Sequence, residues 1–189
     1  MEGSITLSST WFPPVRLRGG NFSIPVGGKY YIPADTDRKS FRERYLKPAL
    51  ADGLIDEGVE ALVCGIPRAE RTEVIKDLLE AKGLLVGSST HNQRMLLNIS
   101  AFMDDLKGLR FSHKIGAAFG SFGWGGGAVA QLEEDLRESG FDVMISEVGV
   151  RWAPDEEQLR KAREFGHRFA REVKLSQAEP VAAHHGTEA

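Results

Sequence analysis

The clearest pattern in this chain runs from Ile115 to Val129 and reads Ile-Gly-Ala-Ala-Phe-Gly-Ser-Phe-Gly-Trp-Gly-Gly-Gly-Ala-Val. An apolar run ends in a glycine-rich loop, and a helical pattern follows at once. This order is typical of a strand, loop and helix in a parallel α/β sheet, where ligands bind beyond the carboxyl ends of the strands. Phe122 and Trp124 stand among residues with almost no side chain, so the loop can lay its backbone and one indole against a planar ligand. The alternative interpretation is a tight turn with a half-buried tryptophan.

The rest of the chain alternates between short apolar segments and helical patterns. The predicted strands cover residues 29–32, 59–64, 84–86, 115–119 and 141–150. The predicted helices cover residues 47–55, 72–82, 95–106, 128–136 and 154–174. We therefore predict a doubly wound α/β domain of the flavodoxin-like type, with a five-stranded parallel sheet and helices on both faces.

Two helix starts carry specific predictions. Pro48 falls inside an otherwise helical pattern, and an interior proline costs about 3 kcal/mol. We therefore predict that this helix begins near Lys47, with Pro48 in its first turn. Thr72 is predicted to cap the next helix. The buried face of that helix is predicted to contain Val74, Ile75, Leu78 and Leu79.

The 189 residues indicate one domain at 29–174, an irregular N-terminal arm at 1–28 and a polar C-terminal tail at 175–189. A net charge of −3 lacks the excess of positive charge that is typical of nucleic-acid-binding proteins. The single cysteine, Cys64, excludes an internal disulfide and suits a reducing compartment. No apolar run reaches the length of a membrane span, and the N-terminus lacks the order of a signal peptide. We expect a cytoplasmic protein without a membrane or nucleic-acid partner.

Three segments carry a family resemblance: residues 84–92, 106–109 and 114–126. They closely resemble the flavodoxin-like domain of flavodiiron proteins, also called A-type flavoproteins. The resemblance extends from about residue 51 to residue 174 and is strongest across two loops. In that family the domain binds FMN and passes electrons to a di-iron centre that reduces oxygen or nitric oxide.

The resemblance implies three groups of FMN-binding residues, one for each loop after a strand. The loop that lies along the flavin matches Ser88, Ser89, Thr90, His91, Asn92 and Gln93. The loop whose backbone and aromatic side chains flank the ring matches Ser121, Phe122, Gly123, Trp124, Gly125 and Gly126. In the first loop, Thr36 and Ser40 align with the phosphate-binding residues of the family. Doubly wound folds bind phosphate in this place, after the first strand.

The chain departs from the family in two respects. It has no His-x-Glu-x-Asp-His run, which holds the two iron ions in the β-lactamase-like domain of flavodiiron proteins. We therefore expect no metal site, and interpret His91, His113 and His167 as surface or loop histidines. In the first loop Arg38 stands at the position of an aromatic residue, and Phe41 at that of a threonine.

These observations favour an FMN-binding electron-transfer module that passes electrons between a reductase and a separate redox partner, for which a di-iron protein is one candidate. The altered first loop supports an alternative, a diverged domain that binds FMN weakly or not at all and acts as an interaction or oligomerisation module. A further alternative is an NAD(P)H-dependent FMN or quinone reductase, although the sequence contains no recognisable nicotinamide-binding motif. The sequence leaves open whether the chain is itself an enzyme and whether it forms a homo-oligomer.

Overall fold

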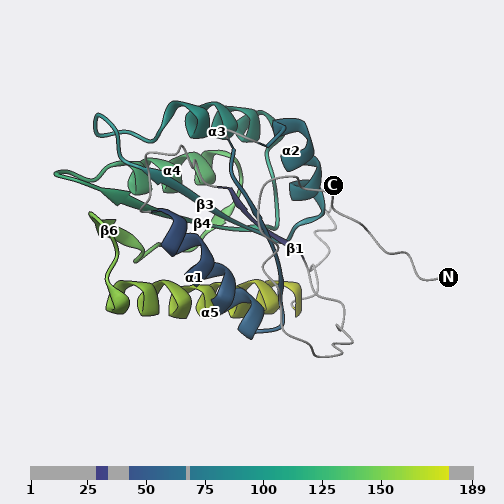
Figure 1. Ribbon diagram of the computed structural model, residues 1–189. Coiled ribbons are helices and arrows are strands. Elements are labelled where there is room, and N and C mark those ends of the chain that lie inside the picture. The colour runs from purple at the N-terminus through teal and green to yellow at the C-terminus, as the bar shows by residue number, and fades with distance from the viewer. Residues whose placement is uncertain (1–28, 34–42, 67–68, 179–189) are drawn as a thin grey trace, which may run out of the picture.

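A parallel β-sheet of six strands lies at the centre of the computed structural model, which describes residues 29–33, 43–66 and 69–178 (Figure 1). The strands follow the order β2-β1-β3-β4-β5, and β6 also pairs with β4. Their bounds are β1 Lys29–Pro33, β2 Glu60–Cys64, β3 Gly83–Ser89, β4 Ile115–Phe122, β5 Asp142–Val143 and β6 Gly149–Arg151. Every pair is parallel. This strand order is the flavodoxin-like one and confirms the predicted fold class.

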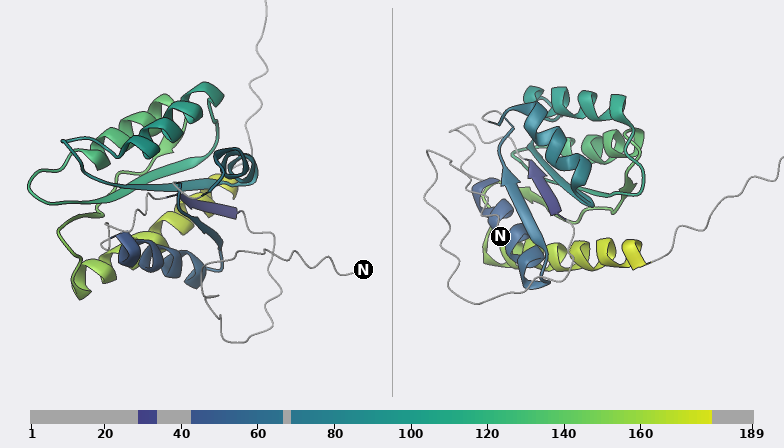
Figure 2. Two further views of the ribbon diagram at one scale, coloured as in Figure 1. Left: turned by 45° about the horizontal axis from the view of Figure 1, so that its top comes forward. Right: turned by 90° about the vertical axis from the view of Figure 1, so that its right-hand side faces the viewer.

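Helices in the described residues cover both faces of the sheet (Figure 2). Their bounds are α1 Glu43–Asp56, α2 Arg71–Glu80, α3 Leu97–Leu109, α4 Ala128–Glu138 and α5 Glu156–Ala178. One hydrophobic cluster lies under α1 and α5 and includes Leu50, Leu54, Phe165 and Phe169. The other lies under α2, α3 and α4 and includes Leu78, Phe102, Leu106 and Leu132. None of the helices in the described ranges combines the length and the apolar character needed to cross a membrane.

The position of Pro48 corrects one prediction. The helix α1 already includes Glu43, so Pro48 lies in its interior and not in its first turn. Its ring is exposed, while Leu46 and Leu50 on either side are fully buried. Burial of such leucine side chains contributes about 2 kcal/mol each, which offsets the cost of the missing hydrogen bond.

The start of α2 and the end of α5 also differ from the sequence prediction. The helix α2 begins at Arg71 after Glu70, whose side chain makes no capping hydrogen bond, so the predicted cap at Thr72 is wrong. Its buried face contains Val74 and Leu78, whereas the side chain of Leu79 is 59% exposed. The helix α5 continues to Ala178, past the start predicted for the C-terminal tail.

The fifth predicted strand, 141–150, is divided into two short strands along β4. The amide of Met144 donates to Gly116 of β4 as β5 ends, and the amide of Gly120 donates to Val148 before β6 begins. Between them the amide of Ser146 donates to the carboxylate of Glu133 in α4, at 2.8 Å. The backbone therefore leaves the sheet because a helix side chain replaces the strand as its partner.

The central strands β3 and β4 are buried along almost their whole length. Their register pairs Ser88 with Gly120 and Ser89 with Ser121. Both strands therefore end at the same level, and the loops that follow them start side by side at the carboxyl edge of the sheet.

Candidate functional site

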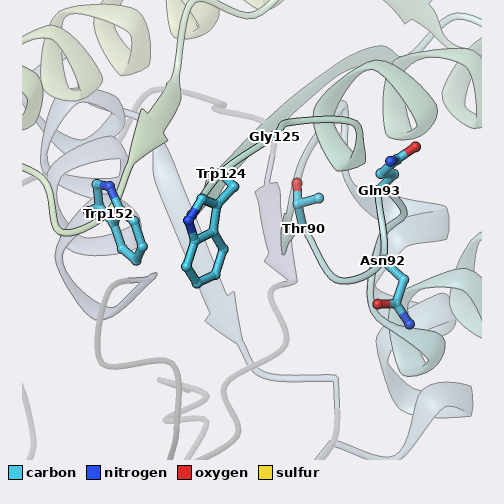
Figure 3. Close-up of a pocket in the computed structure, with 7 residues that line it drawn as sticks. Thr90, Asn92, Gln93, Trp124, Gly125 and Trp152 are labelled. Atoms are coloured by element: carbon cyan, nitrogen blue, oxygen red, sulfur yellow. The ribbon is translucent and has the colours of Figure 1, made fainter.

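A pocket of about 530 Å³ lies at this carboxyl edge, between the loops that follow β3 and β4 (Figure 3). Its lining residues are Thr90, Asn92, Gln93, Gly123, Trp124, Gly125 and Trp152. Six of these seven are among the residues that the sequence predicts for cofactor binding. The volume is in the range of small-molecule sites, about 300–1,000 Å³.

A tight turn shapes the β3 side of the pocket. The amide of His91 donates to the carbonyl of Arg94 at 2.9 Å, and the amide of Arg94 donates back at 3.0 Å. The two residues between them, Asn92 and Gln93, have φ angles of 50° and 63°. Asparagine tolerates this left-handed conformation, whereas for glutamine it costs roughly 1–2 kcal/mol. Both residues of this turn line the pocket.

The two loops are locked together where α4 begins. Gly127 has a φ of 154°, and a Cβ atom built there would lie 2.3 Å from the carbonyl oxygen of Gln93. The next amide, that of Ala128, donates to the hydroxyl of Thr90 at 3.3 Å. The amide of Thr90 itself donates to the carbonyl of Ser121 at 2.8 Å. Only glycine permits this close approach, so the loops form one rigid wall.

Three predicted serines lie beneath the pocket. The hydroxyl of the buried Ser88 accepts from the amide of Leu96 and donates to the carbonyl of Ser89, both at 2.9 Å. The hydroxyl groups of Ser89 and Ser121 lie 3.2 Å apart, and Ser121 is also buried. These side chains join the ends of β3 and β4, and the role of the serines as cofactor contacts stays a prediction.

Trp124 presents its ring to the open pocket. Its side chain is 86% exposed, on a loop whose neighbouring glycines offer backbone amides beside it. The ring of Trp152 contacts it in an edge-to-face arrangement, with centroids 5.1 Å apart and planes inclined by 74°. An exposed indole in a pocket suits a planar aromatic ligand, which removes that apolar surface from water.

Trp152 is the lining residue that our sequence reasoning missed. It follows β6 and lies between the predicted strand at 141–150 and the predicted helix at 154–174, in a segment to which we assigned no role. A signal was nonetheless present, because Trp152 comes just after the last predicted strand, and ligands bind beyond the carboxyl ends of parallel strands.

The other predicted residues lie in different places. His91 and Gly126 belong to the two loops and Phe122 ends β4, but none of the three is among the lining residues. Thr36 and Ser40 lie outside the described residues. The lining residues within the described part of the chain are uncharged, and the guanidinium of Arg151 lies near them, donating from Nε to the carbonyl of Gly123 at 3.1 Å. The described part of the chain contains no group of three or more His, Cys, Asp or Glu side chains placed to hold a metal ion.

A flavodoxin-like sheet with an aromatic pocket beyond its central strands defines a class of cofactor-binding α/β domains. The Flavodoxin family model matches residues 48–166, and the chain belongs to this family. Within it, the chain is related to the flavodoxin modules of flavodiiron proteins, as the resemblance predicted.

Known proteins illustrate this relation. An anaerobic nitric oxide reductase flavorubredoxin of Aeromonas hydrophila is 37% identical over 141 residues, which are 74% of this chain and 28% of that protein. The rubredoxin:oxygen oxidoreductase of Desulfovibrio gigas superposes with a TM-score of 0.75 at 30% identity, covering 80% of this chain and 37% of that one. A flavodoxin from the domain Archaea superposes with a TM-score of 0.70 at 30% identity, over 77% of this chain and 99% of that one. The chain thus spans little more than a quarter of the curated relative.

Proposed function

We propose that this chain binds FMN in the pocket beside Trp124 and serves as an electron-transfer module. The observation that carries the proposal is the 86% exposed indole on a glycine-rich loop, at the position where flavodoxin-like folds bind their ligand. The isoalloxazine ring of FMN is flat and aromatic, so it fits a pocket that offers an open indole face and uncharged amide side chains. When bound, FMN supplies the redox chemistry, and the protein supplies orientation and environment.

In this proposal, different residues of the pocket contact different parts of FMN. Trp124 stacks on one face of the ring, and the backbone amides of Gly123 and Gly125 donate to its polar edge. Asn92 and Gln93 close the opposite wall. The role of Thr36 and Ser40 as phosphate ligands is part of the same proposal. Burial of the ring against Trp124 excludes water from that face.

The partners belong to the proposal as well. We propose a reductase as electron donor and a separate redox protein as acceptor, with a di-iron protein as the first candidate. The relatives described above, an anaerobic nitric oxide reductase flavorubredoxin and a rubredoxin:oxygen oxidoreductase, support this choice. We also propose a cytoplasmic location and a division into 1–28, 29–174 and 175–189, in which the first residues of the C-terminal segment continue α5 as far as Ala178.

The first experiment is a titration of the purified chain with FMN, followed by flavin fluorescence and visible absorption. We expect quenched fluorescence and a structured absorption band near one equivalent of FMN. Trp124→Ala is expected to weaken binding by about five- to 150-fold, because stacking of a flat base on an aromatic side chain contributes about 1–3 kcal/mol.

Leu79→Ala is the matched control. Leu79 is also an exposed apolar side chain, at 59%, but its carbonyl accepts from Lys114, which precedes β4 at the opposite edge of the sheet. This variant is expected to bind FMN like the wild type. No binding to the wild type at micromolar FMN would overturn the proposal and favour the diverged interaction module.

A further inference from the structure

We propose that Trp152 is a positioning residue, which holds the indole of Trp124 so that its open face is directed toward Thr90 and Asn92. This inference rests on the proposed binding of FMN in the same pocket. Figure 3 shows Trp152 on one side of Trp124, and Thr90, Asn92 and Gln93 on the other. A flat ligand that enters between Trp124 and the β3 loop is then stacked on a ring that has already been oriented.

The first argument is the contact between the two rings. Their centroids are 5.1 Å apart and their planes are inclined by 74°, which is a favourable edge-to-face geometry. Trp124 is 86% exposed, so few other atoms restrict its side chain. The neighbouring Gly123 and Gly125 have no side chains to pack against it. Among the described residues, the ring of Trp152 is therefore the contact that we expect to limit the rotamers of Trp124.

The second argument is the anchoring of Trp152 itself. The strand β6 pairs with the end of β4, with Val150 opposite Ser121 and Arg151 opposite Phe122. The amide of Trp152 then donates to the carbonyl of Phe122 at 2.8 Å. Its φ of 64° is unusual for a bulky residue and turns the ring back over the glycine loop.

The third argument is the fit between this ring and Gly123. A Cβ atom built at Gly123 would lie 3.5 Å from two carbons of the Trp152 ring, so the indole covers that glycine at van der Waals distance. On the other side, Arg151 Nε donates to the carbonyl of Gly123 at 3.1 Å. The backbone before Trp124 is thus held by residues of the β6 segment, and its side chain is held by Trp152.

A double-mutant cycle tests the proposal with FMN affinity as the measurement. Trp152→Ala is expected to weaken FMN binding by roughly two- to tenfold, the range of an aromatic pair. In a Trp124→Ala background the same change is expected to have no further effect, because Trp152 acts through Trp124. Trp152→Phe keeps a ring at this position and is expected to restore most of the affinity. An equal loss in both backgrounds would overturn the positioning role and make Trp152 a direct contact or a purely structural residue.

A second readout needs no FMN. In a Trp11→Phe background only Trp124 and Trp152 remain of the three tryptophans, so near-ultraviolet circular dichroism reports their coupling. We expect a signal that Trp152→Ala removes, with an unchanged midpoint of urea unfolding. Its absence from the parent protein would overturn the positioning of Trp124. Failure of FMN to bind while this signal is present would instead overturn the proposed function, so the two failures are distinguishable.

Discussion

The α1–α5 face, where α1 packs on α5, and the pocket at the carboxyl edge of the sheet both contain glycines at which two backbone segments touch. The two regions differ in the side chains that surround these backbone contacts. On the α1–α5 face, Gly53 and Gly166 let the two helices touch, and charged side chains enclose the contact. The carboxylate of Asp56 lies 2.7 Å from Arg163, and that of Glu57 lies 2.7 Å from Arg171. In the pocket, Gly127 lets two loops touch, and the lining residues that the structure describes are uncharged.

This difference shows that the proposed binding site does not coincide with the cluster of titratable groups in this chain. His167 lies between two carboxylates, 3.3 Å from Asp56 and 3.2 Å from Glu57, and resembles a reactive cluster. Each of these acids, however, is also paired with an arginine of α5. The charges lie where α1 packs on α5, whereas the proposed recognition of FMN at the other edge depends on aromatic surface and backbone amides.

The largest expected effect is on the α1–α5 face. Gly166→Ala places a Cβ atom 2.4 Å from the carbonyl oxygen of Leu50, so the helices must separate. We expect a loss of about 3 kcal/mol in the free energy of unfolding, the upper range of overpacking. Urea denaturation measures it. Gly108→Ala in α3 is the matched control, because a Cβ atom there meets nothing within 4 Å, and it is expected to stabilise by about 1 kcal/mol.

A smaller effect on stability is expected at the pocket. Gly127→Ala introduces a Cβ atom 2.3 Å from the carbonyl oxygen of Gln93 at a φ that disfavours alanine. We expect a loss of about 2 kcal/mol in stability. FMN affinity is expected to fall as well, because the two loops are forced apart. Calorimetric titration and urea unfolding separate the two effects. Unchanged FMN affinity would mean that the pocket does not depend on the contact between its loops.

The smallest expected effect is electrostatic and depends on pH. The hydrogen bond from Arg171 lowers the pKa of the Glu57 carboxyl below its ordinary value of 4.5. Ionised Glu57 therefore stabilises the folded state above pH 4.5, and this contribution is lost as the pH falls through the lower pKa of the folded protein. Glu57→Gln is expected to lower the urea midpoint at pH 7, and its difference from the wild type should vanish in acid. Glu164→Gln removes a pair within α5 and should change the midpoint less.

The parts of the fold that follow from local pattern could be predicted from the sequence. The apolar run of β3 and the glycine loop after β4 fixed the central strands and the place of the pocket, because buried parallel strands need apolar residues on both faces. Pro48 shows the limit of such reasoning. Its local cost argued for a shorter helix, and burial of Leu46 and Leu50 against α5 and the sheet outweighed that cost.

The sequence by itself determined the alternation of strands and helices, the parallel sheet and the two loops that line the pocket, since each depends on residues adjacent in the chain. Only the tertiary structure decided that Trp152 meets Trp124 and that Thr90 joins the start of α4. It also decided that Ser88 is buried beneath the site, where its hydroxyl fixes the backbone of Leu96. These contacts join segments that are separated along the chain, and strand register and backbone angles set them. Neither quantity is encoded in the hydrophobic pattern of a single segment.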